Sequence, residues 1–148
     1  MKRIGRVLFA TDFSKASGKA FTTAMALTKA TRSTLTVLHV IKPFTPITPE
    51  QYIATETWEQ IDRQGREWAK RALAKLVGKA KKAGVRATEL LVQGDPARQI
   101  ARVARSWKAD LVVVGTHGRK GLAKVLLGSV AGRVVATAPC PVVTVRAR

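Results

Sequence analysis

The chain has 148 residues, 46% of them hydrophobic, so we expect one domain over residues 1–148 with a buried core, and not a disordered segment. Its 27 lysines and arginines against 9 acids give a net charge of +18, which favours anionic partners such as nucleic acid, acidic lipid or phosphorylated ligands. No apolar run approaches the roughly 20 residues of a membrane helix, which argues against a membrane protein. A single cysteine, Cys140, excludes an internal disulfide and indicates a reducing, cytoplasmic location.

The first half of the chain alternates strand-like and helical patterns. Residues 6–11 form a short apolar run that is typical of a buried parallel strand. Residues 14–30 have apolar residues at helical spacing, with Ser14 as the expected N-cap. Residues 33–41 are rich in β-branched side chains and indicate a second strand. The three prolines of residues 42–50 predict an exposed loop.

The second half continues the alternation. A long helical pattern runs from about residue 50 to 83, and Gly84 is its expected stop. A strand is expected at 85–94, and a helix follows at 95–109 with Asp95 as N-cap and Pro96 at the first helical position. The most apolar strand is expected at 110–115, a helix at 129–138 and a last strand at 140–148. The residues expected on the inward face of the long helix are Ile61, Trp68, Ala72, Leu76 and Ala80.

This order predicts an α/β fold: a doubly wound, Rossmann-like open sandwich with a five-stranded parallel sheet and helices on both faces. In such sheets a ligand binds beyond the carboxyl ends of the strands, where the strand order reverses. Asp12 follows the first strand and Gly115 ends the fourth, so both residues would line one crevice if these strands are neighbours. An acid suits ribose hydroxyls, and a glycine-rich basic segment suits phosphates.

The segment from Gly115 to Ser129 contains four glycines, four basic side chains including His117, and no acid. It is either a charged surface turn or a cradle for an anion. The second interpretation is favoured because Gly128 and Ser129 open a helix whose N-terminal N–H groups attract anions. The sequence has no Walker P-loop, no G-x-G-x-x-G and no G-x-S-x-G, and its two histidines have no acid or cysteine at ligand spacing.

The spacing Gly115-x2-Gly118-x9-Gly128-Ser129 resembles the signature of the ATP-binding branch of the universal stress protein family. The stretches LFATDFS, TVLHVI, DLVVVGTHGRKGLAKVLLGSVAGRVV and APCPVVTVR resemble the rest of that family's fold, so the likeness covers almost the whole chain. One difference is Ala10, where the family often has a proline. The resemblance implies the adenine nucleotide alpha hydrolase-like form of the Rossmann-like sandwich.

The resemblance also implies a set of binding residues. In the family, the acid after the first strand approaches the ribose and phosphates, the backbone at the end of the second strand holds adenine, and the signature and its neighbours meet the ribose and phosphates. The corresponding residues here are Asp12, Val40, Gly115, His117, Gly118, Arg119, Gly128, Ser129 and Val130.

The resemblance implies an ATP-binding protein, with ATP or another adenine nucleotide as ligand, with or without Mg²⁺, and a homodimer formed through the last strand. We expect a nucleotide-dependent switch or stress-response binding module and not an enzyme, since no general base or nucleophile stands beside the phosphate-facing residues. Two alternatives stay open: a slow ATP hydrolase or phosphotransferase that uses Asp12 and Mg²⁺, and a nucleic-acid-binding protein driven by the positive charge. The basic residues of segment 63–86 are interpreted first as a solvated helix face.

Overall fold

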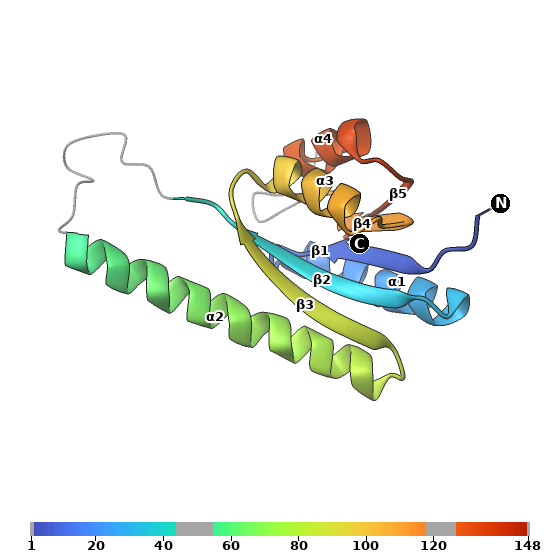
Figure 1. The fold of residues 1–148 in the computed structure, drawn as a ribbon, viewed down its shortest axis with the longest axis horizontal. Helices are drawn as coiled ribbons and strands as arrows, with labels where there is room; N and C mark the ends of the chain where they lie inside the picture. Colours follow the sequence, from blue (N-terminus) through green and yellow to red (C-terminus); the bar gives the residue numbers. More distant parts are fainter. Residues whose placement is uncertain (1, 44–54, 118–126, 148) are drawn as a thin grey trace.

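The computed structural model describes residues 2–43, 55–117 and 127–147. Within them, strands and helices alternate along the chain as the sequence predicts (Figure 1). The elements are β1 (Arg6–Ala10), α1 (Lys15–Thr31), β2 (Thr34–Ile41), α2 (Thr55–Lys82), β3 (Arg86–Gln93), α3 (Pro96–Ser106), β4 (Leu111–Gly115), α4 (Ser129–Thr137) and β5 (Val142–Val145). The predicted loop over 44–50 and the predicted helix start over 50–54 lie outside the described residues.

The five strands form one parallel sheet in the order β3-β2-β1-β4-β5. Helices α1 and α2 cover one face, and α3 and α4 cover the other (Figure 1). This architecture confirms the doubly wound α/β prediction. The chain winds outward from β1 through β2 to β3, then returns to place β4 on the other side of β1, so the strand order reverses between β1 and β4.

Two apolar layers hold the helices against the sheet, because successive side chains of a strand point to opposite faces. In β1, Val7 and Phe9 belong to the layer under α1 and α2, whereas Leu8 belongs to the layer under α3 and α4. All three side chains are fully buried. The centre of the sheet is therefore covered on both faces, so a polar ligand can reach the sheet only at the two ends of its strands.

The predicted inward face of α2 is confirmed at Ala80, which is buried, and is wrong at Ile61 and Trp68. Its buried residues are Ala69, Leu73, Val77 and Ala80, whereas Ile61 and Trp68 are about half exposed, at 49% and 48%. Ile61 lies in the first two turns of α2. This N-terminal part of the helix runs past the ends of the strands, so the sheet does not cover it (Figure 1). The small side chain of Ala69, not the large ring of Trp68, faces the sheet.

The predicted helix ends are confirmed. Ser14 caps α1 and Asp95 caps α3, each through a side-chain oxygen, and Pro96 opens α3. Gly84 has a φ of 83° and ends α2, a left-handed conformation that glycine adopts without strain. In the described ranges, the helices are too short or too polar for any of them to traverse a bilayer.

Candidate functional site

The carboxyl ends of β1, β2 and β4 bring three of the predicted site residues to one edge of the sheet. β1 pairs with β4 in the register Phe9↔Val113, which confirms that the first and fourth strands are neighbours. Asp12 follows the end of β1 by two residues, and Gly115 is the last residue of β4. Val40 lies near the end of β2, the other neighbour of β1. All three therefore lie close to the point where the strand order reverses.

Asp12 forms the turn between β1 and α1. Its Oδ1 accepts a hydrogen bond of 3.0 Å from the Ser14 N–H, and the Ser14 hydroxyl accepts one of 3.2 Å from the Ser17 N–H. Ser14 is therefore the N-cap of α1, and Asp12 holds the backbone of this N-cap residue in place. Among the described residues, no side chain or backbone group donates to Asp12 Oδ2, so this oxygen can accept a hydrogen bond from a ligand.

The same turn contains a strained residue that the sequence did not indicate. Phe13 has a φ of 62°, a left-handed conformation that is rare for a bulky side chain. Its N–H donates to the Thr11 hydroxyl over 2.9 Å, and that hydroxyl also bonds the buried Ser17 hydroxyl. These bonds fix the turn that presents Asp12. No sequence pattern indicates this role for Phe13, because it depends on contacts that exist only in the folded chain.

Aromatic contacts hold the Phe13 ring in place. Its centroid lies 4.5 Å from that of His39 and 5.2 Å from that of Trp68, which it meets edge-on. His39 Nδ1 lies 2.7 Å from the Thr11 carbonyl oxygen, and because a carbonyl only accepts, Nδ1 carries the proton. His39 thus links β2 to the turn that follows β1.

The backbone of Val40 faces the space beyond the end of β1. Backbone groups of alternate residues in a parallel strand point to the same side. The Leu38 carbonyl accepts from the Thr11 N–H on the β1 side, and the Ile41 carbonyl accepts from the Gly94 N–H on the β3 side. The N–H and C=O of Val40 therefore point to the β1 side, where β1 has already ended at Ala10. They are positioned to bond a planar ligand edge.

Two signature glycines, Gly115 and Gly128, differ in the space that the protein leaves for a Cβ atom. A Cβ on Gly115 would lie 3.5 Å from the backbone of Ala16, which is ordinary contact. A Cβ on Gly128 would lie 2.8 Å from the Thr116 carbonyl oxygen, which is too close. The Gly128 N–H donates to this same oxygen. Gly128 is therefore required by the protein itself, because it lets the start of α4 rest on the end of β4.

The start of α4 differs from the starts of α1 and α3 in the residues that the structure describes. In the part of the chain that the structure describes, side chains cap α1 and α3, but none caps α4 at Gly128. Ser129 is exposed and Val130 is partly buried in this first turn. The unsatisfied N–H groups and the positive end of the helix dipole favour an anion here.

Of the remaining predicted site residues, His117 is partly buried at the end of β4, where its Nδ1 lies 3.1 Å from the Thr116 hydroxyl. Gly118 and Arg119 lie outside the described residues. Thr116, which the sequence did not single out, is 97% buried and joins three elements: its N–H donates to the Val145 carbonyl and its carbonyl accepts from Gly128.

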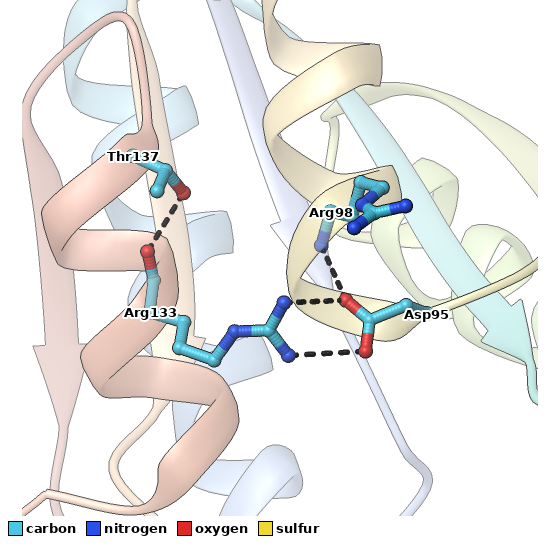
Figure 2. Close-up of polar contacts among 4 residues, drawn as sticks. All are labelled: Asp95, Arg98, Arg133 and Thr137. Atoms are coloured by element: carbon cyan, nitrogen blue, oxygen red, sulfur yellow. Dashed lines mark hydrogen bonds and ion pairs between the residues drawn. The ribbon is translucent and has the colours of Figure 1, made fainter.

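An ion pair fixes α4 relative to α3. Arg133 of α4 donates two hydrogen bonds, of 3.0 and 2.9 Å, to the carboxylate of Asp95, which also caps α3 by accepting from the Arg98 N–H (Figure 2). The Arg133 bond, then the Arg98 N–H, hold the pKa of Asp95 below its ordinary value. The pair is exposed, so its role is to orient α4 more than to stabilise the fold.

A second carboxylate, Asp110, acts at the opposite edge of the sheet. It accepts from the N–H groups of Gly5 and Arg6, over 2.9 and 3.0 Å, and pairs with Lys2. The Gly5 N–H and the Lys2 ammonium lower the pKa of Asp110. The residue thereby ties the segment before β1 to the start of β4.

We expect acid to weaken the fold through these two carboxylates. Their folded-state pKa values lie below the unfolded value of about 4, so they add stability above that pH and lose it as the pH falls through the lowered values. Urea unfolding at pH 7 and pH 3 should show a smaller acid loss in Asp95→Asn than in the native chain. Equal losses in both proteins would show that the Asp95–Arg133 pair contributes nothing.

Within residues 2–43, 55–117 and 127–147, no three histidine, cysteine or acidic side chains gather as a metal site would require. The elements at the carboxyl edge instead offer a carboxylate oxygen, a strand backbone edge and uncapped helix N–H groups. The chain thus has a doubly wound α/β sheet, the class of fold in which ligands bind where the strand order reverses.

The chain belongs to the universal stress protein family, whose model matches residues 3–146. A universal stress protein of Methanocaldococcus jannaschii is 34% identical over 143 residues, which are 95% of this chain and 81% of that protein. The structure of UspA from Lactobacillus plantarum is similar with a TM-score of 0.86 and 25% identity, covering 99% of this chain and 100% of its own.

Solved relatives contain adenine nucleotides. A universal stress protein in complex with cAMP is similar with a TM-score of 0.74 and 26% identity over 99% of this chain and 100% of its own. Two more distant structures share the fold: one from Archaeoglobus fulgidus in complex with dAMP (TM-score 0.69, 20% identity, 97% and 99% covered) and one from Arabidopsis thaliana with AMP bound (TM-score 0.70, 21% identity, 97% and 92% covered).

Proposed function

We propose that this protein binds an adenine nucleotide, ATP in the first place, at the carboxyl edge between β1 and β4, and that occupancy of the site switches its interaction with a partner. The observation that carries the proposal is the convergence of Asp12, the Val40 backbone and the uncapped start of α4 on one strand reversal. The cAMP complex of a relative at 26% identity supports an adenine ligand.

Each part of the nucleotide has a matching group. Adenine would bond to the backbone of Val40, and the ribose hydroxyls to the available oxygen of Asp12. The phosphates would meet the segment that begins at Gly115, beside Gly128, and the N–H groups of Ser129 and Val130 would donate to them from the first turn of α4. His117, Gly118 and Arg119 complete the proposed contacts to ribose and phosphates.

Mg²⁺ fits this site as a companion of the phosphates. Magnesium is commonly held by one or two carboxylates together with substrate phosphates, not by an all-protein cage. Asp12 could supply such a carboxylate from the end of β1. Bound there, the ion would neutralise phosphate charge beside the Asp12 carboxylate.

The switch requires that the nucleotide bind two states of the protein with different affinity, since a ligand with equal affinity for both shifts nothing. The switch also requires that the protein binds an adenine nucleotide at all, and extraction of the purified protein tests this. Protein purified without added nucleotide, then denatured and examined by chromatography, should release an adenine nucleotide in a substantial fraction of molecules. Release of a guanine or pyrimidine nucleotide instead would contradict the proposal.

Slow hydrolysis or phosphotransfer is the rival activity at the same site. If Asp12 and Mg²⁺ oriented a water molecule, phosphate release from ATP would exceed a protein-free blank and would disappear in Asp12→Ala. A binding protein predicts release at the level of the blank for both proteins. Measurement of phosphate over several hours at high protein concentration separates these outcomes.

We also propose a cytoplasmic location, which suits the lone thiol of Cys140. Desolvation, then the nearby charge of Asp110, raises the pKa of this thiol, so that it stays protonated and poorly reactive at neutral pH. Cys140 is partly buried and packs against the apolar layer under α3 and α4, which suits a structural thiol. Cell fractionation with a tagged chain tests the location.

The outer edge of β5 supports a homodimer. β5 ends the sheet at this side, and the carbonyls of Pro141 and Val145 accept from β4, so the backbone groups of Val142 and Thr144 point away from the sheet. An unpaired apolar edge favours pairing with a second copy.

Replacing Thr144 by proline should therefore convert the dimer to a monomer without unfolding it. Proline removes an N–H that points outward, whereas Val143→Pro removes one that bonds β4 and should lower the melting temperature. Light scattering after size exclusion gives the mass of each variant. A dimer that persists in Thr144→Pro with unchanged affinity would place the interface elsewhere.

A further inference from the structure

The end of the sheet at which the strands begin, opposite the proposed nucleotide site, carries an open groove. It has a volume of about 550 Å³, and a neighbouring hollow of about 180 Å³ continues it around the turn that joins α2 to β3. Figure 1 shows this turn and the turn that joins α1 to β2 at the end of the sheet where the strands begin. The groove is separate from the site described above, because the sheet lies between the two edges.

The groove and the hollow are lined by cations from several elements. Lys81 and Arg86 line the groove, and Lys29 and Arg32 line the hollow, where Arg86 also reaches and donates to the Arg32 carbonyl over 3.5 Å. No acidic residue lines either. All four side chains belong to exposed residues, and across the described chain none of them has an ion-pair partner. Cations crowded in this way repel one another, and a polyanion would relieve the repulsion.

The floor and one wall of the groove are suited to a nucleobase. Thr34 and Thr88 lie on the floor, and Trp107, just after α3, forms the wall. The Thr34 hydroxyl donates to the Gly5 carbonyl and the Thr88 hydroxyl bonds that of Thr36, so each has a lone pair left to accept from a base. Arg6 donates to the Trp107 carbonyl over 2.8 Å, and its guanidinium carbon lies 5.9 Å from the centre of the ring, so a further cation lies beside this wall. Proteins bind single-stranded nucleic acid through cations that lie along its phosphate backbone and through aromatic side chains on which its bases stack.

We infer that this groove binds single-stranded nucleic acid, with the phosphates along Lys29, Arg32, Lys81 and Arg86 and one base against Trp107. This assigns part of the +18 charge to a binding surface and not to solvation alone. The inference is independent of the proposed nucleotide site, and saturating AMP should leave the affinity unchanged.

Fluorescence anisotropy of a labelled 15-residue oligodeoxythymidylate tests the groove. We expect the double variant with Lys81→Gln and Arg86→Gln to bind at least about tenfold more weakly at low salt. Its plot of log affinity against log salt should be shallower by about 1.4, since each phosphate contact to a single strand contributes about 0.7. The matched control is Lys70→Gln with Arg71→Gln, which removes the same charge from exposed residues of α2 and should bind like the native chain.

Trp107→Leu tests stacking, because it should weaken binding severalfold without changing the salt slope, whereas Trp107→Phe should retain most of the affinity. The melting temperature of each variant checks that it is folded, since Trp107 is partly buried. No binding by the native chain, or an equal loss in the control pair, would overturn the inference. So would inorganic polyphosphate that competes as well as the oligonucleotide while Trp107→Leu binds normally.

Discussion

Replacing Gly128 by valine should weaken adenine nucleotide binding on the order of a hundredfold, or about 2.8 kcal/mol. A Cβ at this position would lie 2.8 Å from the Thr116 carbonyl oxygen and 3.4 Å from the Cα of His117. The start of α4 would have to move away from the end of β4, and its N–H groups would leave the place where we expect the phosphates. Calorimetric titration with AMP and with ATP measures the loss.

The matched control is Gly132→Ala, one turn further along α4. Its Cβ would meet only the flexible side chain of Leu127 at 3.7 Å, so this variant should fold and bind like the native chain. A second test does not depend on moving α4. Gly115→Ala makes only ordinary contacts within the protein, so a loss of affinity in a variant with native melting temperature must come from the ligand. Native affinity in both Gly128→Val and Gly115→Ala would contradict the proposed site.

Replacing Asp12 by asparagine should weaken binding about tenfold. The amide oxygen can still accept from the Ser14 N–H, so the turn before α1 is preserved. The loss is confined to the charged acceptor that we expect to bond the ribose, and hydrogen bonds to charged groups contribute about 1.5–3 kcal/mol. Calorimetry with AMP gives the affinity, and circular dichroism confirms the fold.

Asp12→Ala distinguishes a binding role from a structural one, because it removes the turn bond as well as the charge. If Asp12→Asn binds normally and only Asp12→Ala is weak, Asp12 acts through the turn alone. Tighter binding by Asp12→Asn would indicate that the carboxylate lies against the phosphates and repels them. Either result would contradict the ribose contact.

The fold could be predicted because local signals agree with the global arrangement. Ser14, Asp95 and Pro96 mark helix starts by chemistry that acts within one turn, and the apolar run of β4 indicates a central strand. The buried face of α2 could not be predicted in the same way. Ala69 and Trp68 are adjacent, and which of them faces the sheet depends on how the helix is rotated about its axis against the sheet, a property of tertiary packing.

Of the site, the positions of Asp12 and Gly115 followed from their places at strand ends once β1 and β4 proved to be neighbours. The residues that support the site could not be predicted from the sequence. Phe13 adopts its left-handed φ because Thr11, His39 and Trp68 hold it there, and these residues meet only in the folded chain. The need for glycine at 128 likewise comes from the Thr116 carbonyl, a contact between two elements and not a property of the signature.

The most direct measurement of the central proposal is an isothermal titration of the nucleotide-free protein with ATP and Mg²⁺, with GTP as the comparison. The Val40 backbone should discriminate the purine edge, so we expect saturable heat with one ATP per chain, weaker binding of AMP, and little or no heat with GTP. No heat and no thermal shift with any adenine nucleotide would contradict the proposal, as would equal binding of ATP and GTP.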